Sequence, residues 1–129
     1  AVTVDFSSSD NKAINKAIEL SNNQSKLILI HILESTNAMV YGENAFDLER
    51  EEDFQKLKLY QNQLLKENIV TEIQLGFGNP KLAIPELILK NNCDILVMGT
   101  HGHKTMKDII LGATIDSIRH EIKITLVLV

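Results

Sequence analysis

Short apolar runs alternate with amphipathic segments along this chain. The runs LILIHILE (residues 27–34) and DILVM (residues 94–98) are almost continuously apolar, which is typical of strands that are covered on both faces. After AVTVDF, apolar residues recur at helical spacing, and Ser8 or Ser9 offers an N-cap for the helix that this spacing predicts. The helical stripe consists of Ala13, Ile14, Ala17 and Ile18. The first strand should end at Asp5.

The longest helix is expected from about Asp47 to Glu67, after an irregular connection at residues 35–46. Within it, EREED (residues 49–53) is interpreted as the solvated N-terminal turns, where acidic side chains suit the helix dipole. The inward face is predicted to consist of Phe54, Leu57, Tyr60, Leu64 and Leu65.

The second half of the chain continues the alternation. IVTEIQL (residues 69–75) alternates apolar and polar positions, as an edge or half-exposed strand does. A helix should follow, with Asn79 as its N-cap, Pro80 in its first turn and Pro85 deeper, where proline removes one backbone hydrogen bond and bends a helix. A last helix precedes TLVLV (residues 125–129), which reads as the final strand.

Strands that alternate with helices predict an α/β fold: a single open parallel sheet with helices on both faces. Such sheets bind ligands beyond the carboxyl ends of their strands, at the point where the strand order reverses. For the order 3-2-1-4-5, that point lies between the first and fourth strands, whose carboxyl ends carry Asp5 and Gly99. The length of 129 residues predicts one domain, residues 1–129.

Three of the six glycines fall within GTHGHKTMKDIILGAT (residues 99–114). Gly99 permits a sharp turn, Gly102 lets the backbone approach a ligand, and Gly112 lies where the last helix is expected to begin. Free amides at a helix N-terminus bind anions, so this arrangement suits a phosphate chain. The spacing is neither that of the dinucleotide motif G-x-G-x-x-G nor that of a Walker loop. The alternative is that the three glycines serve turns only.

Composition and charge exclude some classes of ligand and indicate the cellular compartment. A formal net charge of −4 gives no sign of the basic face that nucleic-acid binding needs. No apolar run approaches the roughly 20 residues that span a bilayer, and the N-terminal segment lacks the regions of a signal peptide. The one cysteine, Cys93, cannot form an internal disulfide, so a reducing compartment, the cytoplasm, is expected. Cys93 itself is interpreted as a small apolar filler.

Taken together, these motifs resemble the universal stress protein family. The three glycines after DILVMG are similar to the family signature G-x2-G-x9-G-[ST], and four further stretches fall where the family has them. These stretches are VDFS (residues 4–7), LILIHILE (residues 27–34), GNP (residues 78–80) and LVLV (residues 126–129). The resemblance implies a five-stranded parallel sheet of order 3-2-1-4-5, of the adenine nucleotide alpha hydrolase-like type. It also implies a homodimer that pairs through the strand at residues 125–129.

The resemblance further implies that ATP or AMP binds between the first and fourth strands, with a magnesium or manganese ion bridging the phosphates. Asp5, next to Val4, would contact the sugar side of the nucleotide, and the backbone at Ile32 would read adenine. The remaining contacts would come from Met98 and Gly99 beside the nucleoside, from His101 and Gly102 over the ribose and phosphates, and from Gly112, Ala113, Thr114 and Ile115 as the phosphate turn.

Ala113 departs from the family signature, which has Ser or Thr directly after the third glycine. Losing one hydrogen bond to a charged group costs about 1.5–3 kcal/mol, and each 1.4 kcal/mol changes affinity about tenfold. The backbone amides of Ala113 and Thr114 remain, and Thr114 offers a displaced hydroxyl. Weakened nucleotide binding, by about ten- to a hundredfold, is therefore expected rather than a lost site.

Several polar side chains have a structural interpretation beside the functional one. Asp5 either contacts the ligand or caps the following helix, and His31 is interpreted as a core histidine rather than a ligand. His101 and His103 fall short of the three or four ligands of a usual metal site, so no metal held by protein side chains alone is expected. Lys104 either pairs with a phosphate or is solvated.

The expected function is adenine nucleotide binding by a regulatory protein of the stress response. No nucleophile–base pair with a recognisable spacing is present, so enzymatic activity is expected to be at most weak ATP hydrolysis, which needs mainly positioning and charge. Two alternatives remain open: a dimeric protein-interaction module of the same fold that binds no nucleotide, and a slow ATPase.

Overall fold

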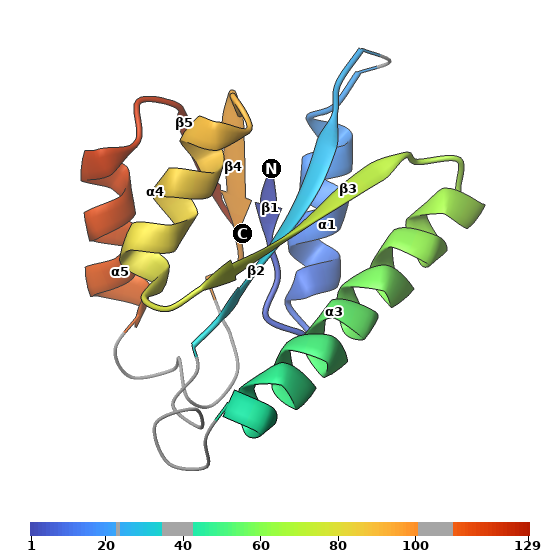
Figure 1. The fold of residues 1–129 in the computed structure, drawn as a ribbon. Helices are drawn as coiled ribbons and strands as arrows, with labels where there is room; N and C mark the ends of the chain where they lie inside the picture. The colour runs from blue at the N-terminus through green and yellow to red at the C-terminus, as the bar shows by residue number, and fades with distance from the viewer. Residues whose placement is uncertain (23, 35–42, 101–109) are drawn as a thin grey trace.

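The computed structural model describes residues 1–22, 24–34, 43–100 and 110–129. Within them, strands and helices alternate as the hydrophobic pattern predicts (Figure 1). The elements are β1 (Val2–Thr3), α1 (Asp10–Glu19), β2 (Leu27–Leu33), α3 (Glu43–Lys66), β3 (Thr71–Phe77), α4 (Pro80–Lys90), β4 (Ile95–Met98), α5 (Ile110–Glu121) and β5 (Thr125–Leu128).

The five strands form one parallel sheet in the order β3-β2-β1-β4-β5, which confirms the predicted order. β1 lies at the centre, with Val2 opposite Leu29 of β2 on one side and Val97 of β4 on the other. This register brings the carboxyl ends of β1 and β4 to the same edge of the sheet. The alternating segment IVTEIQL lies in the region of β3, which is an edge strand as expected.

Helices cover both faces of the sheet, and each face has its own apolar core. α1 and α3 lie against one face, and α4 and α5 lie against the other (Figure 1). β2 supplies both cores because its side chains alternate: Leu27 and Leu29 face one side, and Ile28 and Ile30 face the other. This division explains why LILIHILE is apolar at nearly every position.

The N-termini of α4 and α1 differ in their capping. The side chain of Asn79 accepts a hydrogen bond from the Lys81 amide at 3.0 Å, which confirms Asn79 as the cap of α4. Ser9 occupies the N-cap position of α1 as predicted but makes no capping hydrogen bond with its side chain. The carboxylate of Asp10, the first residue of that helix, instead accepts from the backbone of the preceding turn.

Three predictions about element limits and faces were wrong. α3 begins at Glu43, so residues 43–46 are helical, and its first turn gains a contact between the rings of Phe46 and Phe77, whose centroids lie 5.7 Å apart. EREED is therefore not at the N-terminus of the helix. Leu65 is 56% exposed, because the inward stripe of this helix runs through Leu57 and Leu64. β1 ends at Thr3 rather than at Asp5.

Candidate functional site

The candidate site lies beyond the carboxyl ends of β1 and β4, where the strand order reverses. On the β4 side, Gly99 follows Met98, and the next residue, Thr100, ties this turn to the end of the chain. The Thr100 amide and hydroxyl both donate to the Val129 carbonyl, at 2.7 and 2.8 Å. Val129 in turn donates its amide to the Met98 carbonyl at 3.0 Å. Val129 thus holds the backbone on both sides of Gly99, at Met98 and at Thr100.

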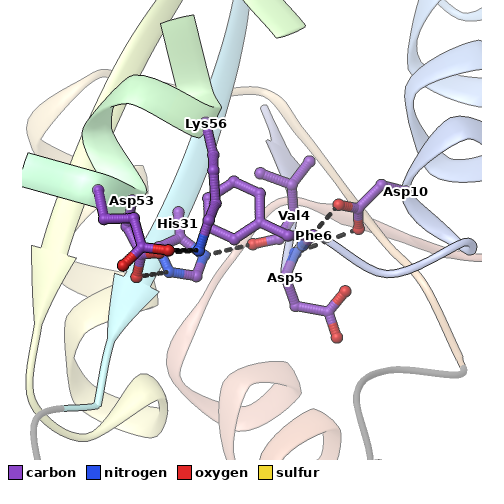
Figure 2. Close-up of polar contacts among 8 residues, drawn as sticks. Val4, Asp5, Phe6, Asp10, His31, Asp53 and Lys56 are labelled. Atoms are coloured by element: carbon purple, nitrogen blue, oxygen red, sulfur yellow. Dashed lines mark hydrogen bonds and ion pairs between the residues drawn. The ribbon is translucent and has the colours of Figure 1, made fainter. Parts of the chain in front are cut away.

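On the β1 side, the turn at residues 4–6 is held mainly by the carboxylate of Asp10. Its Oδ1 accepts from the Asp5 amide at 3.1 Å, and its Oδ2 accepts from the Phe6 amide at 2.7 Å. Phe6 has a φ of 63°, a left-handed conformation that is costly for a residue with a side chain. The two hydrogen bonds to Asp10 stabilise this turn, from which the Asp5 side chain projects (Figure 2).

The side chain of His31, in β2, holds the same turn by contacting the backbone carbonyl of Val4. The imidazole is 9% exposed, and its Nδ1 lies 2.9 Å from the Val4 carbonyl oxygen. Its Nε2 lies 3.1 Å from Oδ2 of Asp53, which is equally buried on α3. Figure 2 shows His31 between Asp53 and the β1 turn. The interpretation of His31 as a core histidine is confirmed, whereas the interpretation of the EREED acids as solvated is wrong for Asp53.

Two further side chains of α3 face the turn. Lys56 donates to Oδ1 of Asp53 at 2.9 Å, and its ammonium lies 5.2 Å from the centre of the Phe6 ring. Its hydrogen bond to Asp53 is the main reason why the pKa of Lys56 is raised. The Tyr60 hydroxyl donates to Oδ2 of Asp10 at 3.1 Å. Asp53, Lys56 and Tyr60 stand at positions i, i+3 and i+7, so one face of the helix carries all three contacts.

Asp10 has an unusual proton affinity for an aspartate. Burial raises its pKa to about 6, and the nearby carboxyl of Asp5 adds to this increase. Hydrogen bonds from the Asp5 amide and from Tyr60 act in the opposite direction. In return, burial and the proximity of Asp10 raise the pKa of Tyr60 to about 12. The carboxyl that organises the turn is therefore also a group that titrates near neutral pH.

The structure brings several of the sequence-predicted site residues to this edge of the sheet. Asp5 is partly buried, and its Oδ1 accepts from the Ser7 amide at 3.1 Å. Ile32 and Met98 lie at the carboxyl ends of β2 and β4, and half-buried Ile115 lies on α5. Gly112, Ala113 and Thr114 fall within the first turns of the same helix, which begins two residues before Gly112. The positions of His101 and Gly102, with those of His103 and Lys104, lie outside the described residues.

Sequence reasoning missed the residues that support the turn. Asp10, Asp53 and Lys56 look like ordinary solvated charges in the sequence, and Tyr60 looks like one more apolar position of its helix. The available signal was their spacing: an acid, a lysine and a tyrosine at i, i+3 and i+7 on the helix face that also carries Leu57 and Leu64. A polar residue within a buried stripe points to a polar partner in the core.

A cavity of about 430 Å³ lies at the other edge of the sheet, at the amino ends of β2 and β4. Its wall includes Lys26, Asn91, Asn92, Cys93 and Asp94. Burial raises the pKa of the Cys93 thiol, so this cysteine is a weak nucleophile and suits the apolar filling role predicted for it. The cavity is separated from the turn at residues 4–6 by the length of the sheet.

No three His, Cys, Asp or Glu side chains among the described residues converge as a metal site would require. No helix in that same part of the chain is long and apolar enough to cross a bilayer.

Comparison with solved structures shows which proteins share this fold. Hypothetical protein MJ0577, the subject of a structure-based assignment of biochemical function, matches with a TM-score of 0.82 and 19% identity, over 99% of this chain and 92% of that one. Universal stress protein UspA from Lactobacillus plantarum matches with a TM-score of 0.78 and 14% identity, over 99% and 95%. A universal stress protein in complex with cAMP matches with a TM-score of 0.72 and 20% identity, over 99% and 93%.

At these identities the likeness establishes the fold alone, an open five-stranded parallel sheet of order 3-2-1-4-5 with helices on both faces. A search of the curated proteins finds no match. The family model described as universal stress protein family matches residues 1–129. The chain therefore belongs to the universal stress protein family.

Proposed function

We propose that this protein is a cytoplasmic regulator that binds ATP or AMP in the crevice beyond β1 and β4, within one domain at residues 1–129. The observation that carries the proposal is that two turns held by hydrogen bonds follow the neighbouring strands β1 and β4, at the topological switch point. One turn presents Asp5, and the other contains Gly99. Parallel sheets place their ligands at such a point. The proposed contacts are Val4, Asp5, Ile32, Met98, Gly99, His101, Gly102, Gly112, Ala113, Thr114 and Ile115.

The phosphates would bind at the start of α5. Gly112 lies in the first turn of that helix, where the backbone amides have no partner within the helix and the helix dipole favours negative charge. A magnesium or manganese ion would bridge the phosphates, which supply the oxygen ligands that such ions prefer. Further support comes from the cAMP complex of a universal stress protein of the same fold, which associates this architecture with an adenine nucleotide.

The test is isothermal titration of magnesium ATP, and separately of AMP, into protein stripped of nucleotide. Ala113→Ser should tighten ATP binding by about ten- to a hundredfold, because it restores one hydrogen bond to a charged group. Gly112→Val is the opposing variant, since a branched side chain at the turn should abolish binding. Absence of binding by the wild type and by Ala113→Ser up to millimolar ATP would overturn the proposal.

The open edge of β5 supports a homodimer as the assembly. β5 pairs with β4 on one side and stands last in the described sheet, and Leu128 is 43% exposed on it. An unpaired edge strand is a template for pairing with another chain, so a second copy at residues 125–129 would satisfy it. Sedimentation at micromolar concentration should give a dimer that Leu128→Lys weakens. A monomeric wild type would refute the dimer and leave the nucleotide proposal standing.

A dimer without nucleotide is the second candidate, favoured by Ala113 in place of the signature hydroxyl. In that case the protein would be an interaction module of the same fold. This second candidate would be supported if sedimentation shows a dimer and neither the wild type nor Ala113→Ser binds ATP in the titrations.

A further inference from the structure

The hydrogen bonds of His31 define its charge. Its Nδ1 faces the Val4 carbonyl oxygen, which can only accept a hydrogen bond. Its Nε2 faces Oδ2 of Asp53, which also only accepts when the carboxyl is ionised. A neutral imidazole carries one N–H, so it would leave one of these two contacts without a proton. The imidazolium carries both protons and satisfies both acceptors.

Lys56 decides where the second proton resides. The alternative to an imidazolium is a neutral ring with a protonated Asp53. However, the Lys56 ammonium donates to Oδ1 of that same carboxyl at 2.9 Å, and a nearby cation favours the ionised form of an acid. The carboxylate of Asp53 thus contacts a nitrogen on each oxygen, Nε2 of His31 on Oδ2 and the Lys56 ammonium on Oδ1. The proton belongs on Nε2 of His31.

The same histidine completes the fixation of the turn that carries Asp5. The Val4 amide donates to the Ile30 carbonyl at 2.9 Å, and the Val4 carbonyl accepts from His31, so β2 holds both polar groups of this residue. The next two amides, of Asp5 and Phe6, are held by Asp10. Successive backbone groups are thereby fixed on either side of the Asp5 side chain.

We propose that His31 is a doubly protonated positioning residue that connects α3, through Asp53, to the β1 turn and so sets the orientation of Asp5 toward the nucleotide. This inference rests on the proposed function for its ligand, but the charge state and the connection are properties of the chain itself. His31 contacts no ligand in this scheme, and it acts through Val4.

The other charges near His31 are consistent with a buried cation. Directly after the strand of His31, the Glu34 carboxyl has a pKa that burial raises and that the charge of His31 lowers. On α3, Asp53 contacts the ring directly, and Lys56 contacts Asp53. On the β1–α1 side, the Phe6 ring contacts the imidazole in a tilted arrangement with 4.3 Å between centroids, and the acids there are Asp5 and Asp10. Among these charged groups, acids outnumber the lysine.

The charge state can be read directly by nitrogen-15 NMR of the imidazole, with His31 assigned by the loss of its signals in His31→Gln. We expect both ring nitrogens of the wild type to carry a proton at neutral pH. Asp53→Asn should convert the ring to a neutral form that keeps the proton on Nδ1, because an amide at position 53 can donate to Nε2. A wild-type ring with one unprotonated nitrogen at neutral pH would overturn the proposal.

The positioning role is tested in the same variants by the backbone amide resonances of Asp5 and Phe6 and by titration of magnesium ATP. Asp53→Asn and His31→Gln should shift both resonances and weaken ATP binding about tenfold. His120→Gln is the matched control, because His120 is exposed on α5, with 70% of its side chain accessible. His120→Gln should change neither the amide resonances of Asp5 and Phe6 nor the affinity for ATP.

The outcomes separate the positioning role from the proposed function. If the wild type binds ATP and the variants match it with unmoved amide resonances, the positioning role is refuted. If the wild type binds no ATP, the proposed function fails, and the amide resonances alone decide whether His31 orients the turn.

Discussion

The buried carboxyl of Asp10 should make folding stability depend on pH in the direction opposite to that of a salt-bridged acid. Asp10 is 3% exposed, and burial raises its pKa from 3.8 to about 6. Below pH 3.8 the group is protonated in both the folded and the unfolded chain, and its contribution to stability is fully present. As the pH rises toward 6, the unfolded chain releases the proton while the folded chain retains it. Stability therefore falls through this window and levels off above it.

The magnitude follows from the two pKa values. Their difference corresponds to about 3 kcal/mol, at about 1.4 kcal/mol for each pH unit. Asp10→Asn removes the titration and keeps one oxygen to accept an amide of the turn. The free energy of unfolding of the wild type minus that of this variant should therefore fall by up to about 3 kcal/mol between pH 4 and pH 7.

The measurement is urea unfolding, followed by circular dichroism in half-unit steps of pH, on the wild type and the variant. Taking the difference cancels the titration of the other acids and histidines. Asp47→Asn, at an exposed aspartate of α3, is the control and should give a nearly flat difference. A difference that rises with pH would refute the reasoning. It would mean that the amide and Tyr60 hydrogen bonds outweigh burial and hold the carboxylate ionised.

Three further tests, each by urea unfolding at neutral pH, address the packing, a helix cap and the backbone of a turn. Leu57→Ala should cost about 2–5 kcal/mol because Leu57 is fully buried, whereas Leu59→Ala, at a side chain 69% exposed on the same helix, should stay within about 0.5 kcal/mol; equal losses would contradict the assignment of the inward face. Asn79→Ala should cost about 1 kcal/mol through loss of the α4 cap, and an unchanged midpoint would show that the cap contributes nothing. Gly78→Ala should lower the free energy of unfolding by about 1–2 kcal/mol, because Gly78 has a φ of 86°. Asn68→Gly, at a residue with a φ of 64°, should be neutral or stabilising. An unchanged stability of Gly78→Ala would refute the backbone argument.

The fold could be predicted from the sequence because its signals are local or periodic. The two-sided burial of β2 appears as the continuous apolar run LILIHILE, and the cap of α4 appears as Asn79 before Pro80. Parallel strands joined by helices then allow few topologies. The switch point and its two turns follow from strand order alone, once that order is assumed.

The support of the turn could not be predicted, because it depends on pairs of residues far apart in the chain. His31 and Asp53 are separated by 22 positions, and Asp10 and Tyr60 by 50. A single aspartate in an acidic run carries no sign that its side chain is buried, so the sequence predicts a solvated Asp53 like its neighbours. The start of α3 at Glu43 could not be predicted for the same reason, because the ring that Phe46 contacts is Phe77 of β3.

The central place of β1 has a consequence for how the chain is made. β1 needs β2 on one side and β4 on the other, and β4 begins only at Ile95. At synthesis rates of roughly 5–20 residues per second, one edge of β1 stays unpaired for several seconds after β2 has left the ribosome. Because β1 consists of Val2–Thr3 alone, the edge of the sheet that waits for β4 is very short. A short edge offers little backbone for another chain to pair with, so the brevity of β1 limits unwanted pairing at the place that β4 later fills.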